Sequence, residues 1–261
     1  MPETATDPVS SKVERISGRI LEGPVPVNSP RVLWGPMSLM EWRKRASELS
    51  GGRSSSVIRR FVIQILRVSG QRGSLIDFGA GRGELLRTLH QTEDFQDLAG
   101  IDLFERSPDL PSSIAWYTRD LNESVKIGRE FDIAICSETI EHLENPRHVF
   151  RTLRGLLRPG GILILTTPNQ ESIRSLCGIL FGGHFTLFLG SCYPAHITAL
   201  VRLDLVRICA ETGFSIPTFF YTNQGGIPKL PSVSWQAVSA GCLRGRLFSD
   251  NLGMMARAQN V

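Results

Sequence analysis

The sequence predicts an α/β fold in which a doubly wound, mostly parallel sheet carries helices on both faces. Three observations predict it. From residue 73 onward, apolar segments of strand length alternate with helical patterns, which is typical of a parallel sheet with crossover helices. The first strand, at 75–78, runs directly into a glycine-rich turn. The second strand ends in an acidic residue about 20 residues beyond that turn, at the distance expected for the neighbouring strand of such a sheet.

Length and composition set the scale of this fold. The chain has 261 residues, of which 41% are hydrophobic and 21% charged, so it can bury one sizeable core with residues left for an extension. The five cysteines are scattered without a Cys-x-x-Cys pair, and we expect them to be reduced core residues of a cytoplasmic protein. The first 25 residues lack the apolar block of a signal peptide, so secretion is not expected.

The chain is expected to have three parts. Residues 1–36 are polar and proline-rich, a composition typical of an extended or disordered lead-in. Residues 37–72 form a helical lid, with one helix predicted at 38–49 and a more amphipathic one at 55–68. Residues 73–261 form the main domain.

Positive charge is concentrated before the first strand. Residues 31–72 contain nine Lys and Arg against two Glu, a local charge of +7 in a chain whose total is +4. The simpler interpretation is a solvated helix face, because most charge runs are solvated. The alternative is attraction of an anionic partner such as a phosphorylated substrate, a membrane surface or nucleic acid.

The remaining elements can be placed in order. The Asn-Pro pair at 145–146 supplies an N-cap and a first helical residue, so a helix should run from there to the Arg-Pro-Gly-Gly turn at 158–161. A second amphipathic helix is expected at 196–212, and the tail at 223–248 has no clear period apart from a short helix near 234–240. Strands are expected at 75–78, 98–102, 114–117, 131–136, 162–166, 214–221 and 251–257.

The glycine-rich turn marks the expected ligand site. Glycines let a ligand approach the backbone, and the helix that begins there offers free N–H groups. The third small residue of a dinucleotide fingerprint would fall on a glutamate or a leucine, so the spacing does not fit NAD. The sequence therefore predicts a nucleotide-type pocket of another kind. Its first motif comprises Asp77, Gly79, Ala80, Gly81 and Gly83.

Polar residues follow the later strands at the same edge of the sheet. Asp102 ends the second strand beside Leu103, and its carboxylate could accept both hydroxyls of a ribose. Asp120 and Leu121 follow the third strand, where Asp120 could also be an ordinary turn residue. The segment Ser-Glu-Thr-Ile-Glu-His-Leu at 137–143 follows the fourth strand and carries the most reactive side chains of the chain.

These motifs together resemble class I S-adenosylmethionine (SAM)-dependent methyltransferases. The resemblance rests on the acidic residue ahead of three alternate glycines, on the Glu-His step at 141–142 and on the Thr-Thr-Pro-Asn segment at 166–169, and it covers roughly residues 73–220. It implies a Rossmann-like, seven-stranded sheet with a final antiparallel strand, and SAM as the cofactor. It also implies that Asp120 and Leu121 hold the adenine.

The site is expected where the glycine turn, Asp102, Asp120 and the pair Ser137-Glu138 converge, with Ser137 and Glu138 on the cofactor side. Displacement at a sulfonium depends mainly on alignment in a dry site, which can supply about 7–11 kcal/mol. A hydroxyl acceptor also needs a proton acceptor, for which His142 and His196 are the candidates. Either histidine could instead be structural.

A metal site is the alternative for the same residues. Glu138, Glu141 and His142 are spaced to share a helix face and resemble the metal-binding stretch of small-RNA 3′-terminal 2′-O-methyltransferases, in which case His196 or His184 could complete the site. That match thins after Asn169, where the RNA enzymes usually continue with Tyr-Asn. The metal-free interpretation is favoured, and a non-catalytic SAM-binding scaffold is the third alternative.

The insertion at 172–195 is apolar, but four glycines and a histidine interrupt it, which argues against a membrane-spanning helix. A cap over the acceptor pocket is favoured, because substrate loops grow at this position in α/β folds. An interfacial surface that meets lipid is the alternative. The expected acceptor is a small molecule, a glycan or a lipid intermediate. Nucleic acid is not expected, because no RNA-binding module is recognised, and the oligomeric state stays open.

Overall fold

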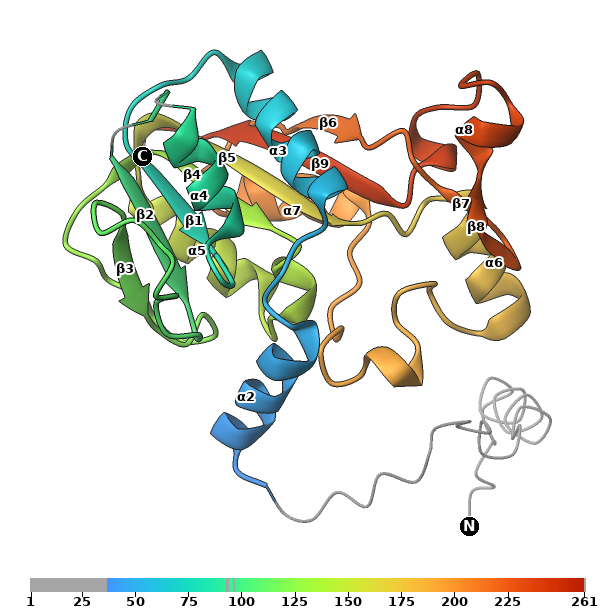
Figure 1. Ribbon diagram of the computed structural model, residues 1–261, viewed down its shortest axis with the longest axis horizontal. Helices are drawn as coiled ribbons and strands as arrows, with labels where there is room; N and C mark the ends of the chain where they lie inside the picture. Colours follow the sequence, from blue (N-terminus) through green and yellow to red (C-terminus); the bar gives the residue numbers. More distant parts are fainter. Residues whose placement is uncertain (1–36, 93, 96, 261) are drawn as a thin grey trace, which may run out of the picture. The chain divides into compact units, whose positions relative to one another are not determined.

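The computed structural model describes residues 37–92, 94–95 and 97–260 (Figure 1). The lead-in predicted at 1–36 lies outside these residues. The helices are α2 (Leu39–Ser50), α3 (Ser56–Ser69), α4 (Glu84–Gln91), η1 (Ile140–His142), α5 (Pro146–Leu156), α6 (Ile173–Gly182), η2 (Gly190–Cys192), α7 (Arg202–Glu211), α8 (Trp235–Val238) and η3 (Arg246–Phe248). The strands are β1 (Leu75–Phe78), β2 (Leu98–Asp102), β3 (Ala115–Thr118), β4 (Phe131–Ser137), β5 (Leu157–Pro168), β6 (Thr218–Tyr221), β7 (Gly226–Ile227), β8 (Leu230–Ser234) and β9 (Asn251–Arg257).

Seven of these strands form one sheet in the order β3-β2-β1-β4-β5-β9-β6. The strands from β3 to β5 are parallel, whereas β9 runs antiparallel to both β5 and β6. The strand order reverses between β1 and β4, which makes their carboxyl ends the place where an open α/β sheet binds its ligand. The predicted doubly wound sheet of seven strands, with an antiparallel last strand at Asn251–Arg257, is confirmed.

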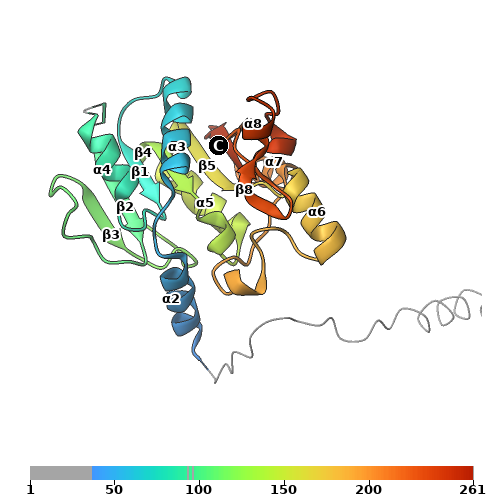
Figure 2. The same cartoon turned by 45° about the vertical axis from the view of Figure 1, so that its right-hand side comes forward.

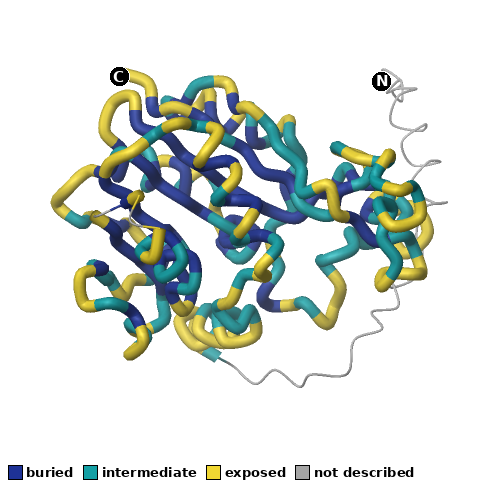
Figure 3. Tube along the Cα trace, turned by 45° about the horizontal axis from the view of Figure 1, so that its top comes forward, coloured by how far each residue is buried: buried dark blue, intermediate teal, exposed yellow. Residues whose placement is uncertain are grey.

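The sheet separates two hydrophobic clusters, because successive side chains of a strand point to opposite faces. On β4, Ile133 and Ile135 join the cluster of α3 and α4, whereas Ala134 and Cys136 join the cluster of α5 and α7. Figure 2 shows α3 and α4 in front of the sheet, and Figure 3 shows buried residues concentrated along the strands.

Local signals place most helix ends where they were expected. Ser38 caps α2 in a capping box with Glu41, and Asn145 caps α5 ahead of Pro146. Helix α7 begins later than the predicted helix at 196–212, because the N–H groups of Ile197 and Thr198 donate to the Glu141 carbonyl instead of starting a helix.

Two strands differ in length from the prediction. Strand β5 begins at Leu157, which pairs with Phe131, so the predicted turn at 158–161 lies inside the strand at a register shift. Strand β6 is shorter than 214–221, because only a single bridge joins Phe214 to Ala258 before the strand starts at Thr218.

Two segments outside the sheet pack together and will be called the outer lobe: residues 172–198, which include α6 and η2, and residues 223–249, which include the β7–β8 hairpin, α8 and η3. The Asn169 side-chain amide donates to the backbone carbonyls of Arg246 and Ser249, which fixes the second segment beside the start of the first. Figure 1 shows α6, α8 and the hairpin grouped at one end of the sheet.

All five cysteines are unpaired. The expectation that they are core residues holds for Cys136 and Cys209 and is wrong for the other three, since Cys242 is exposed and Cys177 and Cys192 are half-buried in the outer lobe. Among the described residues, no helix is long and apolar enough to cross a bilayer.

Candidate functional site

A cavity of about 950 Å³ opens at the carboxyl edge of the sheet. Its walls come from the ends of β1, β2 and β4, from helix α2, and from residues 191–197 of the outer lobe. Every predicted site residue except Gly83 lines it: Asp77, Gly79, Ala80, Gly81, Asp102, Leu103, Asp120, Leu121, Ser137, Glu138, His142 and His196. Gly83 instead caps α4, with a φ of 75° that suits glycine.

The N–H groups of the glycine turn are already engaged within the protein. Gly79 and Ala80 donate to the Ile101 carbonyl, and Gly81 donates to Asp102 Oδ2 at 2.7 Å. These three N–H groups are therefore taken up by the adjoining strand β2 and are not free for a ligand, whereas the free N–H groups expected from the sequence are those at the start of α4.

The backbone of the turn leaves no room for side chains. Gly81 has a φ of 56°, and a Cβ there would lie 2.2 Å from the Gly52 carbonyl oxygen. A Cβ at Gly79 would lie 2.2 Å from Thr139 Oγ1. Both glycines are required by close approach as well as by backbone conformation.

The two acids beside the turn are buried. Asp102 accepts N–H groups from Gly81 and Phe104, and burial raises its pKa against these hydrogen bonds. Burial, and then the neighbouring Asp102 charge, raise the pKa of Asp77 to about 7. Asp102 thus lies next to the glycine turn, as the sequence predicted.

Helix α2 reaches the pocket through an arginine. Arg43 Nη1 contacts Asp120 Oδ2 at 2.9 Å and Glu123 Oε1 at 2.6 Å, while its Nε and Nη2 form a fork with Glu144 at 2.9 Å. The Arg43 side chain is only 11% exposed. The charge pattern of residues 31–72 favoured a solvated helix face. Arg43 instead is buried and links α2 to the loops after β3 and β4 by ion pairs.

Glu138 is held in an unusual conformation. Its φ is 48°, which only a minority of non-glycine residues adopt. Asn251 Nδ2 donates to its Oε2 at 2.8 Å, whereas its Oε1 is buried and has no partner among the described residues. Burial raises the pKa of Glu138 to about 7 against hydrogen bonds from Thr166 and Asn251.

Glu141, His142 and His196 form a cluster in which one ligand-type atom from each lies within 4.8 Å of the others. His142 Nδ1 lies 2.6 Å from the Ala195 carbonyl and must donate to it, so Nε2 carries the ring's lone pair. The His196 ring meets it edge-on, 4.8 Å between centroids, and His196 Nδ1 is buried without a partner among the described residues.

Burial sets the protonation of this cluster. It lowers the pKa of His142 to about 4, and it also lowers the pKa of His196, so both rings are neutral at neutral pH. Burial, and then the Glu138 charge, raise the pKa of Glu141 well above its ordinary value.

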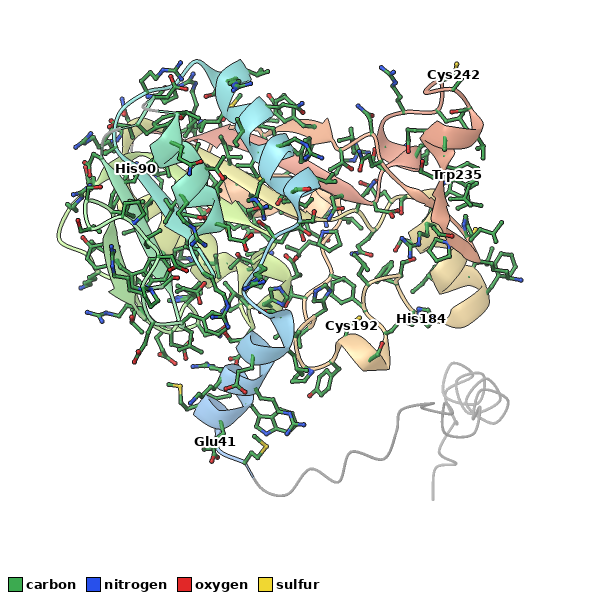
Figure 4. All side chains as sticks on the ribbon, in the orientation of Figure 1. Glu41, His90, His184, Cys192, Trp235 and Cys242 are labelled. Atoms are coloured by element: carbon green, nitrogen blue, oxygen red, sulfur yellow. The ribbon has the colours of Figure 1, made fainter. Side chains whose placement is uncertain are left out.

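The predicted insertion contributes less to the pocket than expected. Residues 191–195 line it, but the α6 part of the insertion does not. His184, which was a candidate to complete a metal site, lies beside the end of α6 (Figure 4) and is not among the lining residues.

Sequence reasoning missed Arg43 and Asn251. Nothing in their neighbourhoods marks either residue, because Arg43 stands in an ordinary charged helix and Asn251 merely starts the last strand. Only the fold brings Asn251 to Glu138, which is 113 positions away in sequence.

Comparison with known proteins gives the family. The profile described as "Methyltransferase domain" matches residues 49–217. The ubiquinone biosynthesis O-methyltransferase of Bordetella avium (strain 197N) is 27% identical over 162 residues, which cover 57% of this chain and 64% of that protein. The chain spans between half and two thirds of the length of the curated relatives it matches.

Two solved structures share the fold. The N-methyltransferase NodS from Bradyrhizobium japonicum WM9, in complex with S-adenosyl-L-homocysteine, superposes with a TM-score of 0.53 at 16% identity, covering 84% of this chain and 100% of that one. The methyltransferase domain of bacterial CtHen1-C superposes with a TM-score of 0.54 at 20% identity, covering 78% of this chain and 100% of that one. The profile match over more than half of the residues, on this sheet and this pocket, shows that the chain belongs to the class I SAM-dependent methyltransferase family.

Proposed function

We propose that this chain binds SAM at the carboxyl edge of the sheet and transfers the methyl group to a hydroxyl of a small-molecule, lipid-type or glycan acceptor. The observation that carries the proposal is the charge of the pocket. A pyrophosphate would need free N–H donors and positive charge, whereas a sulfonium with an ammonium group is attracted by carboxylates. The lining contains two arginines, Arg43 and Arg53, against seven acids: Asp77, Glu84, Asp102, Asp120, Glu138, Glu141 and Glu144.

The predicted cofactor residues have consistent places in this proposal. Asp102 uses two of its lone pairs on backbone N–H groups and keeps others for the ribose hydroxyls. Gly79 and Gly81 offer a wall without side chains, and Ala80 between them adds only a methyl group. Leu103, Asp120 and Leu121 would flank the adenine, and Asp77, Ser137 and Glu138 would face the charged end of the cofactor.

SAM supplies an electrophilic methyl group on a cationic sulfur. The protein has to align the acceptor oxygen with that methyl, exclude water and take the hydroxyl proton. His142 is the proposed base, because its Nδ1 is fixed by Ala195 and its Nε2 keeps a lone pair. His196 packs against the His142 ring and is the second candidate. The ubiquinone O-methyltransferase relatives support oxygen as the acceptor atom.

The cluster also supports a second candidate chemistry, metal-assisted methyl transfer. A neutral imidazole lone pair on His142, a second neutral ring on His196 and the Glu141 carboxylate within 4.8 Å are a fitting donor set for a divalent cation. A hydrogen bond from the other ring nitrogen to a carbonyl is how proteins orient a metal-binding histidine. Such a cation would lower the pKa of an acceptor hydroxyl, which removes the need for a strong base.

One turnover experiment tests the function and separates the two chemistries. Formation of S-adenosyl-L-homocysteine is measured with pools of phenolic, polyprenyl-phenolic and glycan acceptors, with and without EDTA. We expect turnover with a hydroxyl acceptor, and His142→Ala should abolish it while SAM affinity is kept. His90→Ala, on α4 and outside the pocket lining, is the control.

EDTA decides the chemistry. If His142 is the base, EDTA has no effect. If a cation is required, EDTA abolishes turnover, Mg²⁺ or Mn²⁺ restores it, and Glu141→Gln is as damaging as His142→Ala. Salt-sensitive activity on RNA 3′ ends, with none on the other acceptors, would mean that the chain is an RNA 3′-terminal 2′-O-methyltransferase instead. SAM binding without turnover on any acceptor would indicate a scaffold.

A further inference from the structure

Helix α6 carries its large apolar side chains on the outside. Leu176 and Ile179 are 46% and 41% exposed, and Leu180 and Phe181 are 73% and 81% exposed. The buried residue of this helix is a serine, Ser175, whose hydroxyl donates to Gln170. A surface helix of a globular protein normally buries its apolar face and exposes its polar one, so α6 is turned the opposite way.

The second segment of the outer lobe extends this surface. Of the sixteen exposed large apolar residues among the described positions, ten belong to the two segments of the lobe. Residues 223–249 contribute Leu230, Val238 and Leu247, on the hairpin, α8 and η3. An apolar surface concentrated in one part of a molecule marks a place of contact with another body.

The charge of the lobe identifies the kind of body. Residues 172–198 and 223–249 contain four basic side chains and no acidic ones. Arg174 and Arg246 pair with Asp250 and Glu171, which flank the lobe, while Lys229 and Arg244 make no ion pair among the described residues.

Two exposed side chains of the outer lobe also line the pocket. Tyr193 and Ile197 line the cavity and are also 52% and 41% exposed. In Figures 1 and 2, α2, the η2 segment and α6 project from the same side of the sheet. A body seated on the lobe would therefore lie at the mouth through which an acceptor enters.

We propose that the outer lobe docks on the surface of a bilayer that contains anionic lipid. Apolar side chains of α6 enter the headgroup boundary, and Lys229 and Arg244 meet the negative surface potential. The combination of exposed apolar residues with an excess of basic ones fits this partner, because a lipid surface accepts apolar side chains without a complementary shape. Delivery of a lipid-borne acceptor to the pocket rests on the proposed function; docking itself does not.

Co-sedimentation of the full chain with vesicles tests the docking. Vesicles of phosphatidylcholine alone are compared with vesicles that also contain phosphatidylglycerol, without SAM or acceptor. The wild type should bind the anionic vesicles, and more weakly as salt rises. Leu180→Ser with Phe181→Ser should lower the partition coefficient about tenfold or more. Lys229→Gln with Arg244→Gln should weaken binding to anionic vesicles alone.

The matched control is Leu203→Ser with Ile216→Ser, which removes two exposed apolar side chains outside the lobe and should leave partitioning unchanged. Absence of vesicle binding by the wild type, or equal binding by the α6 variant, would overturn the proposal. So would concentration-dependent dimerisation in light scattering that the α6 variant abolishes, because the surface would then serve a second copy. SAM binding by calorimetry is measured on the same samples, so a failure of docking is distinguishable from a failure of the proposed function.

Discussion

At the carboxyl edge of the sheet, carboxylates such as Asp77 and Glu141 are buried to 3% and 1% exposure, whereas on the outer lobe Leu180 and Phe181 are 73% and 81% exposed. Each region therefore places side chains against the usual preference of burial for apolar and exposure for charged groups. Such placement costs stability, and it persists where the groups meet something other than the protein itself. We propose that the two regions differ in what they meet, which is a small cationic ligand in the pocket and a lipid surface on the lobe.

The largest contrast is between a phenylalanine of the hydrophobic core beneath the sheet and one on the outer lobe. Phe150 is fully buried on α5 and packs edge-on against Phe214, while Phe181 projects from α6. Phe150→Ala should lower the free energy of unfolding by about 3–5 kcal/mol, and Phe181→Ala by less than about 0.5 kcal/mol. Chemical denaturation measures both. Comparable losses would mean that Phe181 is packed and that the lobe is not an open surface.

The next largest difference is expected between two glycines, one in the pocket and one on the outer lobe, that share the same backbone conformation. Gly81 and Gly183 both have positive φ, but a Cβ at Gly81 meets the Gly52 carbonyl and a Cβ at Gly183 meets nothing within 4 Å. Gly81→Val should weaken SAM binding by about a hundredfold or more, which is about 3 kcal/mol, and Gly183→Val should leave it unchanged. Calorimetry with SAM decides, and the strain of a positive φ, common to both variants, cancels in the comparison.

How far sequence reasoning reaches also differs between the regions. The Asp77 to Gly83 motif could be predicted from the sequence because a tight turn needs glycine at fixed offsets. The place of Asp102 could be predicted because the alternation of strands and helices makes the strands parallel, and parallel strands end at the same edge of the sheet. The direction in which α6 faces was not readable, since an apolar run of that length suits a cap, a core helix or an interface equally. Arg43 and Asn251 escaped because their partners, Asp120 and Glu138, become neighbours only through folding.

The pocket carboxylate Asp77 should make stability depend on pH in a way that the lobe, which contains no acidic residues, cannot. Its pKa is about 7 in the folded protein against an ordinary value of 3.8. Folding therefore takes up a proton between these values, and the free energy of unfolding should fall as pH rises from about 4 to about 7.

Asp77→Asn should reduce that fall, leaving the part that comes from Glu138, whose pKa is also raised to about 7, and should stabilise the protein at neutral pH by on the order of 2 kcal/mol, with little effect below pH 4. Urea denaturation across this pH range measures the slope. An unchanged slope in the variant would assign the pH dependence to another group.

The smallest difference is expected between two arginine variants, one on α2 at the pocket and one in the outer lobe. Arg43→Ala removes the tie between α2 and the residues Asp120 and Glu144, and should raise the KM for SAM about three- to tenfold with kcat nearly unchanged, a loss of about 1 kcal/mol. Arg244→Ala, in the outer lobe, should leave both constants as they are. Equal effects of the two variants on the KM for SAM would mean that α2 does not contribute to the cofactor site.

Calorimetry of SAM binding near pH 7, in two buffers with different ionisation enthalpies, shows whether the acidic pocket receives a cationic cofactor. Asp77 and Glu138 have pKa values of about 7, and a cation beside them should lower both values. We expect saturable SAM binding with release of protons to the buffer, a release that Asp77→Asn reduces. Tight binding of NAD with no heat from SAM, or SAM binding with proton uptake, would contradict it.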